Sequence, residues 1–196
     1  MKLFHASQTP GIQVLEPRVS NHGRPLLYFS DRRENTLVYL CNAIERHWLA
    51  SGFPPCETYH KWGSYGFTGE GLLCLEEYWP GATEETYGGA AGYVYTVETE
   101  KARPLPEIPH AFTLREPIRV TVSEFVPNAL EALKQAERAG KLALRSYGEN
   151  SPEKLQWIEQ AIRREYEESD SQPYREFLQA KFPQIKGTAE KCSRGV

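Results

Sequence analysis

The chain has 196 residues and a mass of 22.4 kDa, a size that fits one domain with a small appendage. Hydrophobic residues make up 40% of it and charged residues 25%, which is ordinary for a globular protein. The formal net charge of −3 excludes the strong positive field on which bulk nucleic-acid binding depends, although a local basic patch stays open.

The cysteines and the lengths of the apolar runs indicate the cellular compartment in which the chain works. The four cysteines form no C-x-x-C pair, which favours reduced thiols over a disulfide framework. The N-terminus lacks the basic-then-apolar pattern of a signal peptide, and no run approaches the roughly 18 apolar residues of a membrane span. We expect a chain that contacts no membrane and works in the cytoplasm, or in a host cell that it reaches without a cleaved signal.

Two histidines and two cysteines in the first half are candidate metal ligands: His47, Cys56, His60 and Cys74. Their spacing fits none of the usual structural zinc patterns. No metal is therefore expected.

The first residues predict two strands separated by turns. Residues 2–5 and 26–30 are short apolar runs, and residues 12–17 between them are predicted to be extended. A polar loop is expected over residues 20–25.

A helix is predicted to begin at Arg32. Asp31 and Glu34 have the spacing of a capping box, in which a side chain before the helix and one in its first turn bond to backbone N–H groups. Apolar residues then recur at helical spacing and predict a buried helix face, made of Leu37, Leu40, Cys41, Ile44 and Trp48.

The middle of the chain gives weaker signals. Residues 49–91 are rich in glycine, proline and aromatic residues, and we expect an irregular β region there. A clearer strand follows over residues 93–97, then a proline-rich extended loop over residues 104–109 and a strand over residues 118–126.

The last third changes to helical patterns. We expect a helix over residues 128–140, a second one capped by Ser151, a third over residues 173–182 and a loose tail over residues 187–196. The layout is α+β: a mixed β core, one early helix and a helical C-terminal layer.

One carboxylate interrupts an apolar face of the strand over residues 118–126. Alternate residues of a strand share a face, and this face carries Ile118, Val120, Val122, Glu124 and Val126. Burying a carboxylate is costly without partners, so Glu124 is a candidate functional residue. The alternative is an exposed strand end that leaves Glu124 in water.

Three short motifs occur in a fixed order. Residues 4–7 read Phe-His-Ala-Ser, and residues 28–31 read Tyr-Phe-Ser-Asp, with Thr36 and then Tyr39 following in the expected helix. Residues 123–126 read Ser-Glu-Phe-Val. In this order, with two tyrosines eleven residues apart, the chain resembles the ADP-ribosyltransferase superfamily, in the branch of diphtheria toxin and the poly(ADP-ribose) polymerases.

The resemblance implies a division of the chain. Residues 1–127 would form an ADP-ribosyltransferase-like core with a split mixed or antiparallel β-sheet, in which residues 49–91 are an irregular insertion. The strand over residues 93–97 matches the core strand that the family places between its second and third motifs. Residues 128–186 would be a helical extension and residues 187–196 a loose tail.

The resemblance also implies that NAD is a substrate and that His5, Tyr28 and Glu124 form a catalytic triad. NAD releases nicotinamide through an oxocarbenium-like state, in which a carboxylate offsets the developing positive charge. Glu124 would hydrogen-bond the nicotinamide ribose and orient the acceptor. The acceptor itself, a protein or a nucleic acid, is not defined by the sequence, and neither is the oligomeric state or a toxin-like role.

The remaining contacts to NAD follow from the same resemblance. Tyr28 and Tyr39 would flank the nicotinamide ring, where stacking holds a flat cation. His5 would hydrogen-bond the adenosine ribose. The carboxamide would be held by Ser7 and by the backbone of Ala6, and Thr36 stands where the family often has a serine.

Two alternatives stay open. Ala6 replaces the glycine that the family prefers, and its methyl group crowds the ligand, which favours an inactive module that binds NAD or ADP-ribose without transfer. The other is an enzyme like the RNA 2′-phosphotransferases, which use NAD on a phosphorylated RNA. Its phosphate-binding arginines would be Arg18, Arg24, Arg32 and Arg33, while the net charge opposes it.

Overall fold

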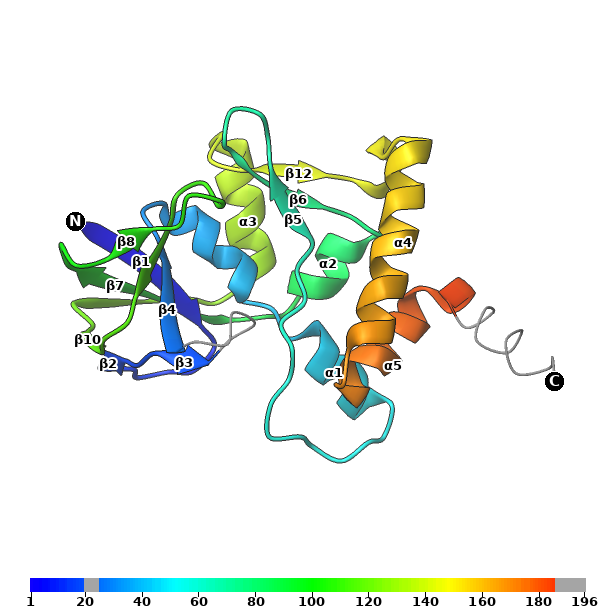
Figure 1. Cartoon of the computed structure of the whole chain (residues 1–196), viewed down its shortest axis with the longest axis horizontal. Helices are drawn as coiled ribbons and strands as arrows, with labels where there is room; N and C mark the ends of the chain where they lie inside the picture. Colours follow the sequence, from blue (N-terminus) through cyan, green and yellow to red (C-terminus); the bar gives the residue numbers. More distant parts are fainter. Residues whose placement is uncertain (20–24, 186–196) are drawn as a thin grey trace.

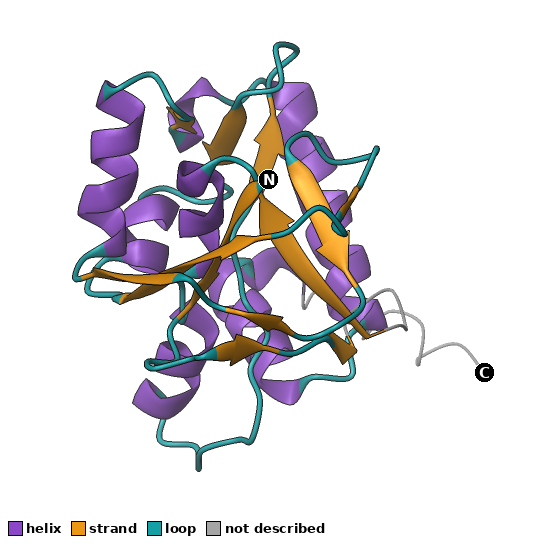
Figure 2. Cartoon of the chain, turned by 90° about the vertical axis from the view of Figure 1, so that its left-hand side faces the viewer, coloured by secondary structure: helices purple, strands orange, loops and turns teal. Residues whose placement is uncertain are grey.

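The computed structural model describes residues 1–19 and 25–185 as a mixed α+β protein. The N-terminus and the main sheet lie at the left of Figure 1, and helices α4 (Pro152–Glu168) and α5 (Gln172–Lys181) lie at the right. Figure 2 views the molecule from the sheet end and shows helices beside and behind the strands. The α+β class expected from the sequence is confirmed.

The main sheet is antiparallel and, within the described residues, has seven strands in the order β11–β7–β1–β4–β9–β8, with β3 paired to β4. The strands are β1 (Lys2–Ser7), β3 (Arg18–Val19), β4 (Pro25–Ser30), β7 (Gly92–Glu98), β8 (Arg103–Pro104), β9 (Ala111–Leu114) and β11 (Val122–Val126). The strands expected near residues 2–5, 26–30 and 93–97 are confirmed as β1, β4 and β7.

Two smaller sheets complete the β structure of the described chain. One pairs β2 (Val14–Leu15) with β10 (Ile118–Arg119). The other joins β5 (Tyr65–Phe67), β6 (Leu73–Glu76) and β12 (Ala143–Arg145), with β12 parallel to β6.

The other helical segments are α1 (Ala43–Ala50), α2 (Ala82–Tyr87), α3 (Ala129–Arg138) and two 3₁₀ helices, η1 (Arg33–Tyr39) and η2 (Tyr147–Glu149). The helices expected in the last third are confirmed as α3, α4 and α5. Ser151 caps α4 as expected, its side chain accepting a hydrogen bond from the backbone N–H of Lys154. Helix α2 was not expected, because residues 49–91 carry no clear helical period.

The two faces of the main sheet bury different cores. Ala6 and Val94 point to the face that packs against η1 and α3. Leu3 and Tyr95 point to the opposite face, which is covered by the small β2–β10 sheet through Leu15. Successive residues of a strand alternate between these faces.

A third core is aromatic and lies away from the main sheet. It joins residues of the 49–91 region to α1, α4 and α5, and its buried aromatic members are Trp62, Trp79, Tyr174, Phe177 and Phe182. The C-terminal helices therefore pack on the region that the sequence left irregular.

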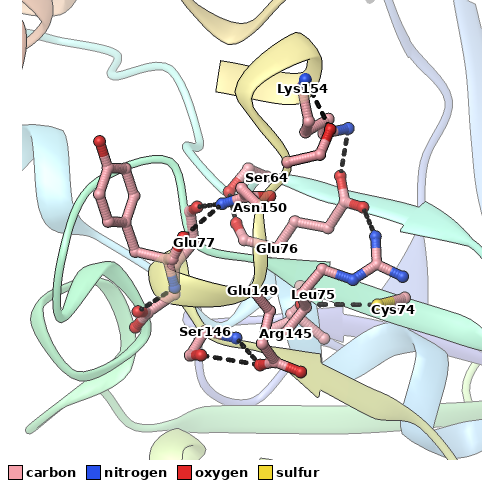
Figure 3. Close-up of polar contacts among 12 residues, drawn as sticks. Ser64, Cys74, Leu75, Glu76, Glu77, Arg145, Ser146, Glu149, Asn150 and Lys154 are labelled. Atoms are coloured by element: carbon pink, nitrogen blue, oxygen red, sulfur yellow. Dashed lines mark hydrogen bonds and ion pairs between the residues drawn. The ribbon is translucent and has the colours of Figure 1, made fainter.

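The buried carboxylate of Glu77, next to β6, ties the small sheet to the C-terminal third (Figure 3). It accepts a hydrogen bond from the backbone N–H of Tyr147 at 3.1 Å, and the Glu77 carbonyl accepts one from the Asn150 side chain at 2.9 Å. The neighbouring Glu76 pairs with one cation on β12 and one on α4, Arg145 and Lys154. This network holds β12 and the start of α4 against β6.

The helix expected from Arg32 is wrong as a single element, because the chain forms η1 and then α1. Asp31 does not cap it: its carboxylate pairs with His110 Nδ1 at 2.9 Å, and no side chain caps η1. The predicted buried face is confirmed across both pieces, with Leu37, Leu40, Cys41, Ile44 and Trp48 all in the core.

Long-range hydrogen bonds interrupt that helix. The Val38 carbonyl accepts a hydrogen bond from the Tyr87 hydroxyl at 3.2 Å, and the Cys41 carbonyl accepts one from Lys61 Nζ at 2.9 Å. In a continuous α-helix these carbonyls would accept from N–H groups four residues on. Tertiary contacts therefore override the helical period here.

The single strand expected over residues 118–126 is also wrong. Its first part, β10, pairs with β2, and its second part, β11, is the edge strand of the main sheet. Of the face predicted to be buried, Val126 is buried, and Ile118 and Val120 are partly buried against the core that contains Leu15. Val122 is 55% exposed and Glu124 is exposed, so the face lies open at these two positions. An edge strand has one neighbour, which leaves its side chains less covered than those of a central strand.

No helix within residues 1–19 and 25–185 is both long and apolar enough to span a membrane. Residues 20–24 of the expected polar loop and the expected tail over residues 187–196 lie outside the described residues.

Candidate functional site

The register of the main sheet places Glu124 on the same face as Ala6. Glu124 lies opposite Val94, and Val94 lies opposite Ala6 on the next strand. Directly paired residues project to the same side of a sheet. The helix-covered face of the sheet therefore carries both the carboxylate and the position where the related family prefers glycine.

Tyr28 shares this face as well. It is two residues before Ser30, and Ser30 pairs with Phe4, which is two residues before Ala6. Glu124, Val94 and Ala6 form a row across three neighbouring strands, and Tyr28 lies near the end of this row on β4. The backbones at Glu124 and Tyr28 are thus three strand spacings apart, or about 14 Å. A ligand that contacts both side chains has to reach across that width.

Tyr39 ends η1 close to Tyr28, with 44% of its surface exposed. Its hydroxyl lies 2.8 Å from that of Tyr65. Partial burial, followed by the effects of Tyr65 and Tyr28, raises the pKa of Tyr39 above its ordinary value. Three phenols therefore gather beside the same face. Tyr65 was missed by the sequence reasoning, since nothing in the irregular region marks it.

Glu124 is held by Arg33 at the start of η1. The Arg33 guanidinium donates to both carboxylate oxygens, Nε to Oε2 at 2.9 Å and Nη2 to Oε1. The hydrogen bond to Glu124 raises the pKa of Arg33. Half of the Glu124 side chain is exposed, so the pair contributes only about 0–1 kcal/mol to stability. Its main consequence is to fix the orientation of the carboxylate.

His5 projects to the opposite face of the sheet. It pairs with Tyr95, and its ring meets the edge of Phe29, both members of the other core. Its Nδ1 lies 3.0 Å from the Tyr28 carbonyl oxygen, which can only accept. Nδ1 therefore carries the hydrogen and Nε2 remains an acceptor. Burial lowers the pKa of His5, which favours the neutral ring.

The side chains of Ser7 and Thr36 form hydrogen bonds with backbone groups two or three residues away. The Ser7 hydroxyl accepts a hydrogen bond from the Thr9 N–H at 3.2 Å. Thr36 is 2% exposed, and its hydroxyl donates to the Arg33 carbonyl at 2.7 Å. Thr36 is therefore a core residue of η1 that offers a ligand almost no surface, contrary to the role expected for it.

The structure thus brings four of the expected site residues to one face, namely Ala6, Tyr28, Tyr39 and Glu124, and places His5 and Ser7 on the other. It also adds Arg33, which the sequence marked only as a possible phosphate ligand. Within the described parts of the chain, no three side chains of His, Cys, Asp or Glu gather as a metal ion would need.

Comparison of the chain with models of known protein families, with curated proteins and with solved structures finds no match.

Proposed function

We propose that the chain is an NAD-dependent ADP-ribosyltransferase that cleaves the nicotinamide–ribose bond and transfers ADP-ribose to a macromolecular acceptor, a protein or a nucleic acid. The observation that carries the proposal is the shared sheet face of Ala6, Tyr28 and Glu124, with Tyr39 beside Tyr28. A stacking surface and an ionised carboxylate are the two parts that this reaction needs.

In the proposed reaction, Tyr28 and Tyr39 hold the nicotinamide ring, and Glu124 offsets the positive charge that develops on the ribose. Arg33 orients the carboxylate before the substrate arrives. To hydrogen-bond a ribose hydroxyl, Glu124 has to use a lone pair that Arg33 leaves free or to release one of its two bonds.

The arrangement of β1 and β4 supports the split sheet of the proposed fold. The two strands pair through Phe4 and Ser30, and beyond that pair the His5 ring bonds to the Tyr28 carbonyl. The free thiols Cys41, Cys56 and Cys74 suit the cytoplasm as the compartment of this proposal.

A second candidate function is an NAD or ADP-ribose sensor without transfer. Both oxygens of Glu124 are bonded to Arg33, and Ala6 puts a methyl group where the family prefers none. In such a module the ligand binds at the tyrosines while the carboxylate stays in its ion pair.

Release of nicotinamide from NAD, with and without protein or nucleic acid as acceptor, tests the proposal. Glu124→Gln keeps the shape and removes the charge, so we expect a loss of about 10²–10³-fold in rate. NAD should raise the melting temperature of both proteins, because Glu124 acts on the transition state more than on binding. Tyr39→Ala should remove that rise.

The outcomes separate the two candidates. Equal rates for wild type and Glu124→Gln would remove Glu124 from the mechanism. A thermal shift with NAD but no turnover in either protein would assign the sensor function. Absence of any shift with millimolar NAD, nicotinamide or ADP-ribose would refute both.

A further inference from the structure

A pocket of about 820 Å³ lies along the outer strands of the main sheet, on the side of Tyr28 away from Glu124. Tyr28 on β4 pairs with Thr113 on β9, and Thr113 pairs with Arg103 on β8. All three line the pocket, so its floor is one row of side chains across three strands. Its volume is that of a small-molecule site.

The pocket carries an excess of positive charge. Lys101, Arg103 and Arg115 line it, and Glu116 is the one carboxylate among the lining residues. Glu116 pairs with Lys101 at 2.8 Å. Arg103 and Arg115 have no ion pair or hydrogen bond of their side chains within residues 1–19 and 25–185. Two unneutralised guanidinium groups beside one cavity are notable in a chain with a net charge of −3.

The other walls of the pocket are apolar or aromatic. Leu26 and Leu105 contribute aliphatic surface, and Tyr28 contributes a ring. Guanidinium groups bind phosphate through paired, charge-assisted hydrogen bonds, while an aromatic ring with aliphatic neighbours accepts a flat ring. The two kinds of surface meet in a single pocket.

We propose that this pocket binds a small molecule with a phosphate monoester and a flat ring, of the type of a free mononucleotide. Arg103 and Arg115 bind the phosphate, and Tyr28 with the two leucines receives the ring. The pocket and the proposed NAD site share Tyr28 and the same face of the sheet, but the pocket extends over β9 and β8, beyond Tyr28 from Ala6 and Glu124. Its cationic residues are not used in the proposed NAD chemistry, so the inference does not require that chemistry.

Calorimetric titration of the full chain with AMP, adenosine and inorganic phosphate tests the proposal. AMP should bind at least about 10-fold more tightly than either fragment, because it alone engages both surfaces. Arg103→Gln and Arg115→Gln should each weaken AMP binding about 10-fold or more, since each removes a charge-assisted contact. Arg164→Gln, an exposed arginine of α4, is the matched control and should leave AMP affinity unchanged.

Tyr39→Ala separates this pocket from the proposed NAD site. It should keep AMP affinity even if it abolishes the thermal shift with NAD. Equal affinity for AMP and adenosine, unchanged affinity in both arginine variants, or loss of AMP binding in Tyr39→Ala would each overturn the proposal.

Discussion

The imidazole of His5 lies where β1 and β4 pair through one residue pair, and it bonds to the backbone of the neighbouring strand. The sequence marked His5 as a ligand contact, but a single chain does not show which face of the sheet the ring will take. The face is decided by the pairing of His5 with Tyr95 and by the contact of its ring with Phe29. The pairing with Tyr95 makes His5 a structural residue, whatever its role with a ligand.

His5 should make stability depend on pH. Its pKa is lowered from 6.5 in the folded chain, mainly by burial, so the unfolded chain binds a proton first as the pH falls. The free energy of unfolding should therefore be constant above about pH 6.5 and decrease below it, until the folded-state pKa is passed. His47, whose pKa is also lowered by burial, acts in the same direction.

His5→Gln isolates this contribution, because glutamine keeps a donor for the Tyr28 carbonyl and does not titrate. Urea unfolding at about pH 7.5 and about pH 5.5 should show a smaller loss of stability in His5→Gln than in wild type. The same loss in both proteins would show that another group, such as His47, carries the effect.

At the scale of elements, prediction succeeded where local signals act alone. Ser151 caps α4 through its own side chain as expected, and the helix expected over residues 128–140 forms as α3 with a side-chain cap at Asn128. Prediction failed where residues distant in the sequence determine the local structure. Lys61 and Tyr87 take the carbonyls that would have continued the first helix, and neither position is visible from the helical period.

The candidate site shows the same limit. The resemblance grouped His5, Tyr28 and Glu124 as a triad, and the structure keeps Tyr28 and Glu124 on one face but turns His5 to the other. The burial expected around Glu124 was also wrong, since Glu124 and Val122 beside it are exposed. Arg33, its partner, comes from a different element at a separation of 91 residues, and single-chain patterns carry no such pairing.

Gly92, at the start of β7, allows the close approach of β1 and η1 that holds the site face together. A Cβ at this position would lie 2.6 Å from Leu40 Cδ2 and 2.9 Å from the Ser7 carbonyl oxygen, and backbone cannot easily yield. Gly92→Ala should lower the free energy of unfolding by about 1–3 kcal/mol. Gly66→Ala in β5 is the control, because a Cβ there meets nothing within 4 Å, and it should change stability by less than about 1 kcal/mol. Equal effects in urea unfolding would contradict the packing argument.

The whole molecule is built around three cores, and the aromatic one connects the parts that the sequence separated. Trp62 and Trp79 come from the region called an irregular insertion, and Phe177 comes from α5 in the region called a helical extension. Their ring centroids lie 5.8 Å from Phe177 in both cases. The division at residue 127 stays a prediction, and these contacts indicate that the two parts unfold together.

Phe177→Ala tests that cooperativity. Phe177 is 1% exposed, so its truncation leaves a cavity among the tryptophans and should cost about 3–5 kcal/mol. If the chain is one cooperative unit, tryptophan fluorescence, which reports mainly on the aromatic core, and far-UV circular dichroism, which includes the sheet, should move to the same lower urea midpoint. Phe53→Ala, at an exposed ring stacked on Trp48, should shift the midpoint far less. If fluorescence shifts alone while circular dichroism keeps a transition at the wild-type midpoint, the C-terminal helices and the insertion form a unit that unfolds separately from the sheet.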